Sequence, residues 1–501
     1  MPRMVLSVLS GVLLTLGFPS LNLYFISWVA LVPLMLALRG RGLREAFVWG
    51  YTCGLVHNFT VFFWIRYVIH HYGGLPLPLA LGILLLLCLY LGLYQAGFAL
   101  MFHFWERRPR LMLVGLPCAW VLLEFIRAHA VTGFPWANLG YTQTPLLHLI
   151  QFADITGVYG VGWLVVLGNA VVFAWFTGPK PVAGSLVFAL CLWGAFHYGD
   201  VRIAQLKAVQ ETEAGFNVAV IQGNIDQSQK WKPAFQQETL RRYRQLSMEA
   251  VSGEQKPELL VWPETSAPFL YGVDERLTEQ LNAIIEDAGV PILFGSPSVV
   301  QVDGAVRFQN KAYLSDGTSR PLGEYAKQHL VPFGEYVPLQ RILFFVNRLV
   351  EFAGDFVPGR DVAPILFKEH SLGVLICYEG IFPYLARRAV TRGATALVNI
   401  TNDAWYGPTS APYQHMEISR WRAVEFRRPL IRSANTGIST FVGVTGDLCG
   451  TIPLNEQGFL VCRVRPCREG TFYGTWGDAF AWICVVLTAG GMLLTACKQD
   501  V

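Results

Sequence analysis

Three short segments each place a reactive side chain directly after a run of apolar, β-type residues. Leu-Val-Trp-Pro-Glu ends in Glu264, Tyr-Ala-Lys ends in Lys327, and Gly-Val-Leu-Ile-Cys ends in Cys377. Strand ends are where α/β folds present reactive groups, because the strand is rigid and the following loop is open. An idle charge would be costly in such apolar surroundings. The three residues together therefore indicate a catalytic site in which Cys377 is the nucleophile.

A thiol, a carboxylate and an ammonium are a chemically complete set for acyl transfer. The Cys377 thiol is largely protonated near neutral pH and needs a base, a role that the Glu264 carboxylate can fill. The Lys327 ammonium can stabilise both the thiolate and the negative oxygen of a tetrahedral intermediate. Histidine is the usual base for cysteine, but neither His329 nor His415 occupies a comparable strand-end position. A Cys-His site with His415 is therefore disfavoured.

Apolar length and charge divide the chain into a membrane section, a water-soluble section and a final membrane section. Of the 501 residues, 53% are hydrophobic and only 15% are charged, whereas a soluble domain is usually about 25% charged. The charges concentrate between about 201 and 470. We expect a transmembrane domain of seven helices over 1–198 and a catalytic domain over 199–475. A C-terminal transmembrane helix with a short cytoplasmic tail should occupy 476–501.

Eight apolar segments are candidates for membrane-spanning helices, which need about 20 apolar residues each. The first follows Arg3, but no cleavage site of the A-x-A type comes after it, so we expect a retained helix rather than a signal peptide. If all eight cross the membrane, the lysine- and arginine-rich connections fall on one side, which the positive-inside rule makes the cytoplasm. The soluble section would then face the periplasm of a Gram-negative bacterium. The segments are 4–18, 22–38, 45–66, 76–104, 111–127, 156–176, 182–198 and 476–497.

The soluble section alternates β-type runs with helical patterns and therefore predicts an α/β fold. Its roughly 250 residues are ample for one sizeable core. The expected strands are 216–221, 259–262, 291–294, 374–377, 396–400 and 440–444, and the expected helices are 235–250, 274–288, 381–391 and 412–426.

The remaining composition argues against several other classes of protein. The net charge of +4 without a basic run argues against nucleic-acid binding. The cysteines show no CxxC spacing, so we expect neither a metal site nor a cofactor. The membrane segments lack paired ionisable residues at mid-depth, which argues against a transporter. A disulfide among Cys449, Cys462 and Cys467 stays open, because nothing in their spacing selects a pair.

Longer motifs around the three reactive residues resemble a known family. Val-Trp-Pro-Glu, Tyr-Ala-Lys-Gln-His-Leu-Val-Pro-Phe-Gly-Glu and Ile-Cys-Tyr-Glu are similar to the Glu-Lys-Cys triad segments of the nitrilase superfamily. Phe-Gly-Glu-Tyr-Val-Pro, Asn-Ile-Thr-Asn-Asp-Ala-Trp-Tyr-Gly and Arg-Pro-Leu-Ile-Arg-Ser-Ala-Asn-Thr-Gly narrow the resemblance. Together with the flanking apolar helices, they resemble the apolipoprotein N-acyltransferases over nearly the whole chain.

This resemblance implies both a fold and a reaction. The fold would be eight transmembrane helices with a periplasmic nitrilase-like αββα sandwich, in the bacterial inner membrane. The enzyme would take an acyl chain from a phospholipid, typically the sn-1 chain of phosphatidylethanolamine, in a ping-pong mechanism through a thioester. The acceptor would be the α-amino group of the N-terminal diacylglyceryl-cysteine of apolipoproteins. We expect a monomer surrounded by membrane lipids. The alternative is a membrane-tethered nitrilase-type amidase, in which water takes the acyl group.

The resemblance also implies roles for single residues. Glu264 would be the general base, Lys327 the stabiliser of the oxyanion and Cys377 the nucleophile. Glu335, in Phe-Gly-Glu, matches a further carboxylate of the family and would orient Lys327.

Residues outside the triad would support the reaction or admit the substrate. Tyr378 and Glu379 flank the nucleophile, the backbone near Tyr378 helping to bind the oxyanion and Glu379 acting as a support. Trp231 matches a tryptophan near the substrate entrance, although an ordinary surface position would equally explain it. The apolar stretches 333–337 and 344–357 would line a lipid entry, the second as a lid that dips into the membrane or as a buried helix.

Overall fold

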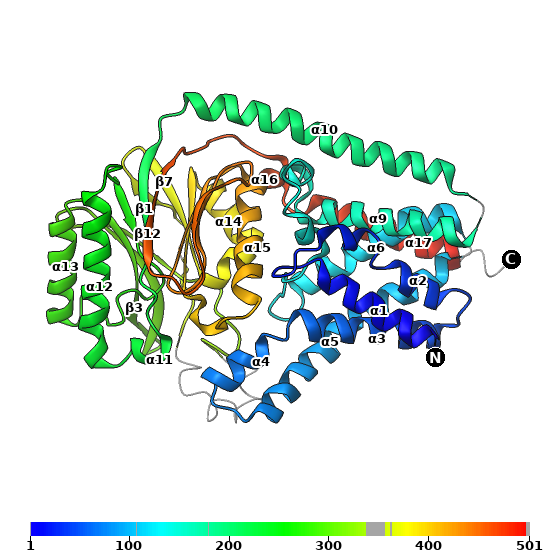
Figure 1. The fold of residues 1–501 in the computed structure, drawn as a ribbon, viewed down its shortest axis with the longest axis horizontal. Coiled ribbons are helices and arrows are strands. Elements are labelled where there is room, and N and C mark those ends of the chain that lie inside the picture. Colours follow the sequence, from blue (N-terminus) through cyan, green and yellow to red (C-terminus); the bar gives the residue numbers. More distant parts are fainter. Residues whose placement is uncertain (1, 107, 179, 337–355, 361–362, 497–501) are drawn as a thin grey trace. The chain divides into compact units, whose positions relative to one another are not determined.

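The chain forms two compact units in the structure, which is a computed structural model. The helical unit comprises Met1–His70, Leu75–Gln205 and Thr471–Val501, and the sheet unit comprises His71–Gly74 and Leu206–Gly470. The structure describes all residues except 1, 107, 179, 337–355, 361–362 and 497–501, which are drawn in grey in Figure 1.

The helical unit is built from helices of very different lengths. Long apolar helices form its body, and short helical turns connect them. The bounds are α1 (Pro2–Leu16), η1 (Tyr24–Trp28), α2 (Val32–Leu38), α3 (Leu43–Val61), α4 (Ile65–Tyr67), η2 (Val68–Tyr72), α5 (Leu77–Trp105), α6 (Pro109–His129), η3 (Leu139–Gln143), α7 (Leu147–Ile150), α8 (Ala153–Thr156), α9 (Val158–Thr177), α10 (Val182–Thr212), α16 (Phe472–Trp476) and α17 (Ala479–Ala496).

All eight predicted apolar segments overlap helices of this unit. Among the described residues, four helices are long and apolar enough to cross a membrane, namely α5, most of α6, α9 and α10. Helix α10 continues to Thr212, well past the predicted end at 198, because a helix does not stop where its residues become polar. Its second half, with Arg202 and Lys207, keeps good helix formers and has neither proline nor a C-terminal glycine until Gly215.

The predicted segment 22–38 is not one continuous helix. η1 ends at Trp28 and α2 begins at Val32, and the side chain of Asn169 from α9 fills the break. Asn169 Oδ1 accepts from the N–H of Leu31 at 2.8 Å, and its Nδ2 donates to the carbonyl of Ser27 at 2.9 Å. Pro33, in the first turn of α2, has no N–H and interrupts the helix here, and the distant asparagine satisfies backbone groups that the break leaves open.

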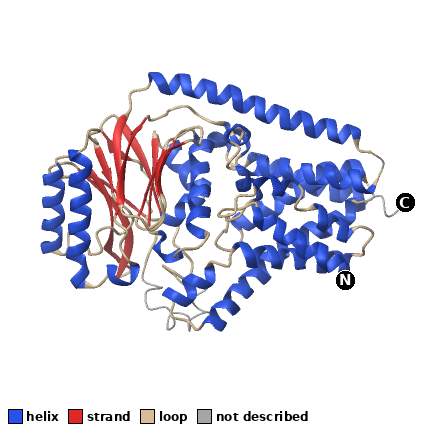
Figure 2. Ribbon diagram, viewed as in Figure 1, coloured by secondary structure: helices blue, strands red, loops and turns tan. Residues whose placement is uncertain are grey.

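Two six-stranded sheets form the centre of the sheet unit (Figure 2). The first, called here the β1 sheet, has the order β12-β1-β2-β3-β4-β5, and the second, the β7 sheet, has the order β11-β10-β9-β8-β7-β6. Their bounds are β1 (Phe216–Gln222), β2 (Leu259–Val261), β3 (Ile292–Val302), β4 (Ala305–Ser315), β5 (Pro321–Ala326), β6 (Ile365–Phe367), β7 (His370–Ile376), β8 (Ala396–Thr401), β9 (Leu430–Ala434), β10 (Ser439–Val442), β11 (Leu448–Ile452) and β12 (Gly458–Val464).

Helices cover the outer face of each sheet. Helices α12 and α13 lie against the β1 sheet, and α14 and α15 lie against the β7 sheet (Figure 1). The predicted αββα sandwich is therefore confirmed. The helices and turns of this unit are α11 (Gln227–Lys230), α12 (Pro233–Ser252), α13 (Glu275–Ala288), η5 (Cys377–Ile381), α14 (Pro383–Thr391), η6 (Asp403–Tyr406) and α15 (Ala411–Phe426).

The apolar core explains why the inner strands have unbroken hydrophobic sequences. On β1, Val218 and Val220 pack toward the other sheet, in one cluster with Val374 and Ile376 of β7. The alternate residues of β1, such as Ile221, pack under α12 and α13. A strand that is buried on both faces needs apolar residues at every position. Because β1 runs parallel to β2, and β7 to β8, their carboxyl ends lie at shared edges of the sheets.

A disulfide joins the two sheets at their edges. Cys449 on β11, an edge strand of the β7 sheet, is bonded to Cys462 on β12, an edge strand of the β1 sheet. Cys467 is a free, buried thiol that packs with Leu206 and Val444. The pairing that the sequence left open is thus Cys449 with Cys462.

Replacing both bonded cysteines with serine should lower stability without lowering activity. A disulfide that closes a loop of this size stabilises a protein by about 3 kcal/mol, chiefly by restricting the unfolded chain. We expect a lower melting temperature for the Cys449→Ser, Cys462→Ser variant, measured without reductant, and unchanged enzymatic activity at temperatures where the variant is folded. An unchanged melting temperature would show that the bond contributes little to the fold.

Candidate active site

Cys377 lies at the carboxyl end of β7 and begins the tight turn η5. It is only 5% exposed, and its φ of 54° lies in the left-handed region, which costs a non-glycine residue about 1–3 kcal/mol. Burial and the Glu264 carboxylate raise the pKa of the thiol, while the Lys327 ammonium opposes them. The thiol is therefore protonated in the resting protein, and a base must take its proton before the sulfur can attack.

Glu264 follows β2 and points both carboxylate oxygens at hydrogen-bond donors. Its Oε1 accepts from Asn310 Nδ2 at 2.7 Å and lies 3.5 Å from Lys327 Nζ. Its Oε2 accepts from the backbone N–H of Asn402 at 2.8 Å. The side chain is buried, so these contacts rather than water hold the carboxylate in place.

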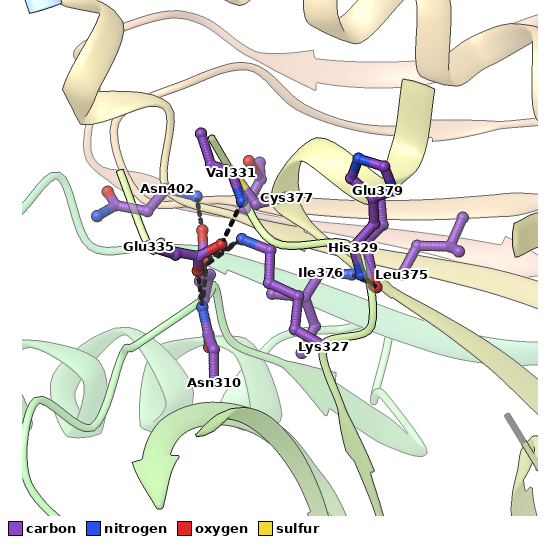
Figure 3. A network of polar contacts seen from close by, with 12 residues as sticks. Asn310, Lys327, His329, Val331, Glu335, Leu375, Ile376, Cys377, Glu379 and Asn402 are labelled. Atoms are coloured by element: carbon purple, nitrogen blue, oxygen red, sulfur yellow. Dashed lines mark hydrogen bonds and ion pairs between the residues drawn. The ribbon is translucent and has the colours of Figure 1, made fainter. Parts of the chain in front are cut away.

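Lys327 follows β5, and its ammonium lies between two carboxylates (Figure 3). Nζ is 2.9 Å from Glu335 Oε1 and 3.5 Å from Glu264 Oε1, and the side chain is 1% exposed. Burial acts to lower the pKa of Lys327, but the two carboxylates outweigh it, so the pKa lies above its usual value and the group is charged. Glu335 is itself held by the N–H of Val331, which donates to Oε2 at 2.8 Å. Glu335 therefore lies where it can orient Lys327.

Glu379 fastens the nucleophile's turn to the segment that follows Lys327. Its carboxylate accepts from the N–H groups of Ile376 at 2.7 Å, Gln328 at 2.6 Å and His329 at 3.0 Å, and from the hydroxyl of Tyr325. Burial raises the pKa of Glu379 to about 7, although the backbone donors partly oppose it. The residue thus supports the geometry of the site from behind.

Tyr378 and Trp231 occupy contrasting surroundings. Tyr378 is buried, and its ring packs edge-on against Phe382. Trp231 directly follows α11 and is 41% exposed, so its indole faces the exterior of the sheet unit. Within the stretches predicted to line a lipid entry, the structure describes 333–336 and 356–357; the predicted lid between them lies outside the described residues.

His415 approaches the backbone of the nucleophile rather than its thiol. Its Nε2 is 3.1 Å from the carbonyl oxygen of Cys377, and its Nδ1 is 2.8 Å from Asp403 Oδ1. Both ring nitrogens are thus engaged, which agrees with the expectation that His415 is not the base.

Three polar residues around the triad are absent from the sequence prediction. Asn310 on β4 donates to Glu264, and Asn402 follows β8 and does so through its backbone. Lys230, next to Trp231, is buried and donates to the carbonyl oxygen of Glu264 at 3.1 Å. Burial lowers the pKa of Lys230 to about 8, against the opposing effect of Glu264. Only Asn402 had a signal in the sequence, since it belongs to the Asn-Ile-Thr-Asn-Asp motif.

Comparison with known proteins identifies the family. Residues 10–171 match the family model described as apolipoprotein N-acyltransferase N-terminal domain, and residues 217–467 match the one described as carbon-nitrogen hydrolase. The chain is 42% identical to the apolipoprotein N-acyltransferase of Geobacter metallireducens, over 98% of this chain and 94% of that protein. It is 31% identical to that of Methylococcus capsulatus, over 98% and 95% of the two chains. The chain therefore belongs to the apolipoprotein N-acyltransferase family, membrane acyltransferases of lipoprotein biosynthesis that combine apolar helices with a carbon-nitrogen hydrolase fold.

Proposed function

We propose that the chain moves an acyl group from a phospholipid to the amino terminus of a lipoprotein through a thioester on Cys377. The donor would typically be the sn-1 chain of phosphatidylethanolamine, and the acceptor the α-amino group of an N-terminal diacylglyceryl-cysteine. The proposal depends on one observation, which is that Glu264 and Lys327 are buried and in contact near Cys377. Glu264 Oε1 lies 3.5 Å from Lys327 Nζ, and both charges act on the pKa of the Cys377 thiol.

In the first half-reaction, Glu264 takes the thiol proton and the sulfur of Cys377 attacks the ester carbonyl carbon. The negative oxygen of the tetrahedral intermediate is stabilised by the Lys327 ammonium and by backbone N–H near Tyr378. The intermediate collapses with cleavage of the ester C–O bond. The departing alkoxide receives the proton from Glu264 and leaves as a lysophospholipid, while the acyl chain stays on sulfur.

In the second half-reaction, the lipoprotein amine attacks the thioester carbon. Glu264 accepts the proton that the nitrogen loses, the C–S bond breaks, and Cys377 recovers its proton. The product is an amide. The similarity to apolipoprotein N-acyltransferases supports an amine rather than water as the acceptor. Appearance of free fatty acid in place of the amide would favour the amidase alternative.

The membrane helices suit substrates that keep their acyl chains in lipid. Transfer of a chain into water would cost about 0.8 kcal/mol for each CH₂ group. We propose that the protein lies in the bacterial inner membrane with both termini in the cytoplasm and the sheet unit in the periplasm. The disulfide between Cys449 and Cys462 supports this side, because disulfides persist in oxidising compartments.

Removal of the nucleophile should abolish both half-reactions. We expect the wild-type protein, incubated with phosphatidylethanolamine alone, to gain the mass of one acyl chain on Cys377, as measured by intact-mass spectrometry. Cys377→Ala should gain no mass and transfer nothing to a diacylated peptide, while it keeps the melting temperature of the folded protein. Acylation of the peptide by purified Cys377→Ala would contradict the mechanism.

Loss of the Glu335 charge should slow the reaction. In Glu335→Gln, Lys327 keeps Glu264 as its one carboxylate partner and shifts toward the base, away from the developing oxyanion. We expect kcat for acyl transfer to fall roughly 10- to 100-fold, less than the roughly 100- to 1000-fold for complete loss of one oxyanion donor, because Lys327 itself remains. The matched control is Glu324→Gln, since Glu324 also pairs with a lysine, Lys311, but is more than half exposed. Equal rates in the two variants would remove Glu335 from the mechanism.

The proposed periplasmic location of the sheet unit can be tested by adding one exposed cysteine at a time and comparing its labelling with that of the wild-type protein. Gln255 is exposed in the turn between α12 and β2, and Arg44 is exposed near the start of α3. In spheroplasts, a membrane-impermeant maleimide should label Gln255→Cys and leave Arg44→Cys unlabelled until the membrane is opened. Labelling of Arg44→Cys alone would place the sheet unit in the cytoplasm.

A further inference from the structure

A fully buried cluster of polar side chains lies behind the nucleophile and is not used by the mechanism above. This cluster, called here the Asp403 cluster, has no exposed member. Its parts come from β8, η6, α15 and β9, so residues far apart in the chain meet at one point. Its members are Asn399, Thr401, Asp403, His415 and Arg432.

Asp403 is the centre of the cluster. Its Oδ1 lies 2.8 Å from His415 Nδ1 and accepts from the Thr401 hydroxyl at 2.9 Å, and its Oδ2 accepts from Arg432 Nη2 at 2.7 Å. Burial acts to raise the pKa of Asp403, but Arg432 and His415 outweigh it and bring the pKa to about 2. Asp403 is therefore a charged carboxylate that holds the His415 ring in one orientation.

Because the His415 ring is held in one orientation, it also restricts the backbone of Cys377. Its Nε2 lies 3.1 Å from the carbonyl oxygen of Cys377, which also accepts from Asn399 Nδ2 at 3.3 Å. Burial and Arg432 lower the pKa of His415, and Asp403 and the Cys377 carbonyl oppose them. The net effect is a lowered pKa, so the ring is neutral and carries one proton. Only a proton on Nε2 lets the ring donate to the Cys377 carbonyl, and we place it there; Nδ1 then lies 2.8 Å from Asp403 Oδ1 and 3.2 Å from Arg432 Nη2.

Two donors on one carbonyl fix the plane of the peptide that joins Cys377 to Tyr378. In a trans peptide the C=O and N–H groups point in opposite directions. The carbonyl faces His415 on α15, which covers the outer face of the β7 sheet (Figure 1). The Tyr378 N–H therefore points away from His415 and α15.

We propose that His415, held by Asp403, is a positioning residue that aims the Tyr378 N–H at the oxyanion of the tetrahedral intermediate. The left-handed φ of Cys377 makes such a hold necessary, because the backbone would otherwise relax from this conformation. The inference rests on the proposed thioester mechanism. It assigns His415 no contact with the substrate and no proton transfer.

Two reactions of the same thiol can separate this role from a general structural one. Acylation by phosphatidylethanolamine passes through an oxyanion, whereas alkylation by iodoacetamide forms an S–C bond and releases iodide without one. Both require Glu264 to take the thiol proton. We would measure the two rates on the full-length protein in detergent, following the thioester by intact mass and alkylation on the peptide that contains Cys377.

His415→Phe should lower the acylation rate roughly 10- to 100-fold, since a lost oxyanion donor reduces rates by that order or more. The alkylation rate should stay within about threefold of wild type, because no oxyanion forms. Asp403 keeps Arg432 and Thr401 in this variant, which favours folding. His415→Gln keeps an N–H donor and should recover most of the acylation rate. The matched control Glu264→Gln should lower both rates.

A proportional loss of both rates in His415→Phe, or a loss of neither, would overturn the inference. If that variant does not fold, as judged by its melting temperature, His415→Met provides the same comparison with a flexible side chain that lacks a donor. A wild-type protein that forms no thioester would instead overturn the proposed function. A wild-type thioester with an unchanged ratio of rates in the variants would overturn the role of His415 alone.

Discussion

The site depends on one constraint, which is that a buried ammonium must have carboxylates beside it. Lys327 is 1% exposed, so water cannot solvate its charge, and Glu335 and Glu264 do so instead. Removing one partner of a buried charge pair typically costs about 3–5 kcal/mol, because the other charge is left uncompensated. The ends of β2 and β5 and the turn that carries Glu335 must therefore come together when the sheet unit folds. The base and the cation of the proposed reaction are in place as a consequence of this electrostatic requirement.

The same requirement recurs on the other side of the nucleophile. Asp403 and Arg432 form an ion pair with no exposed surface, and Glu379 is surrounded by backbone donors. Buried polar groups of this kind are costly unless every member is satisfied, and when satisfied they permit one arrangement only. The turn at Cys377 thus has a cluster of fixed charges on either side. Apolar packing between the sheets supplies most of the stability, and the polar clusters select the geometry.

Strand-end chemistry could be predicted from the sequence because β2 and the last four residues of β7, 373–376, are buried and lack polar side chains. Strand β4 mixes polar with apolar residues and is only partly buried over much of its length, so neither it nor Asn310 stood out. Asp403 and Arg432 lie in two of the motifs that carried the family resemblance, but their contact was missed because they are far apart in the chain. The break in 22–38 had a local signal in Pro33, whereas the residue that satisfies its backbone, Asn169, lies 138 residues beyond Leu31. Local pattern located the elements and the three reactive residues, whereas contacts between distant residues decided how they are held.

The left-handed backbone at Cys377 has a consequence for how this position can vary. Glycine adopts such a φ without a steric penalty, so on conformational grounds glycine is the residue that would best suit the turn. Cysteine persists there at a cost to folding, and the supports around it offset that cost. If stability were the only property under selection, substitutions that replace this cysteine with glycine would therefore be favoured. The nucleophile is a position where selection for chemistry must act continuously against selection for stability.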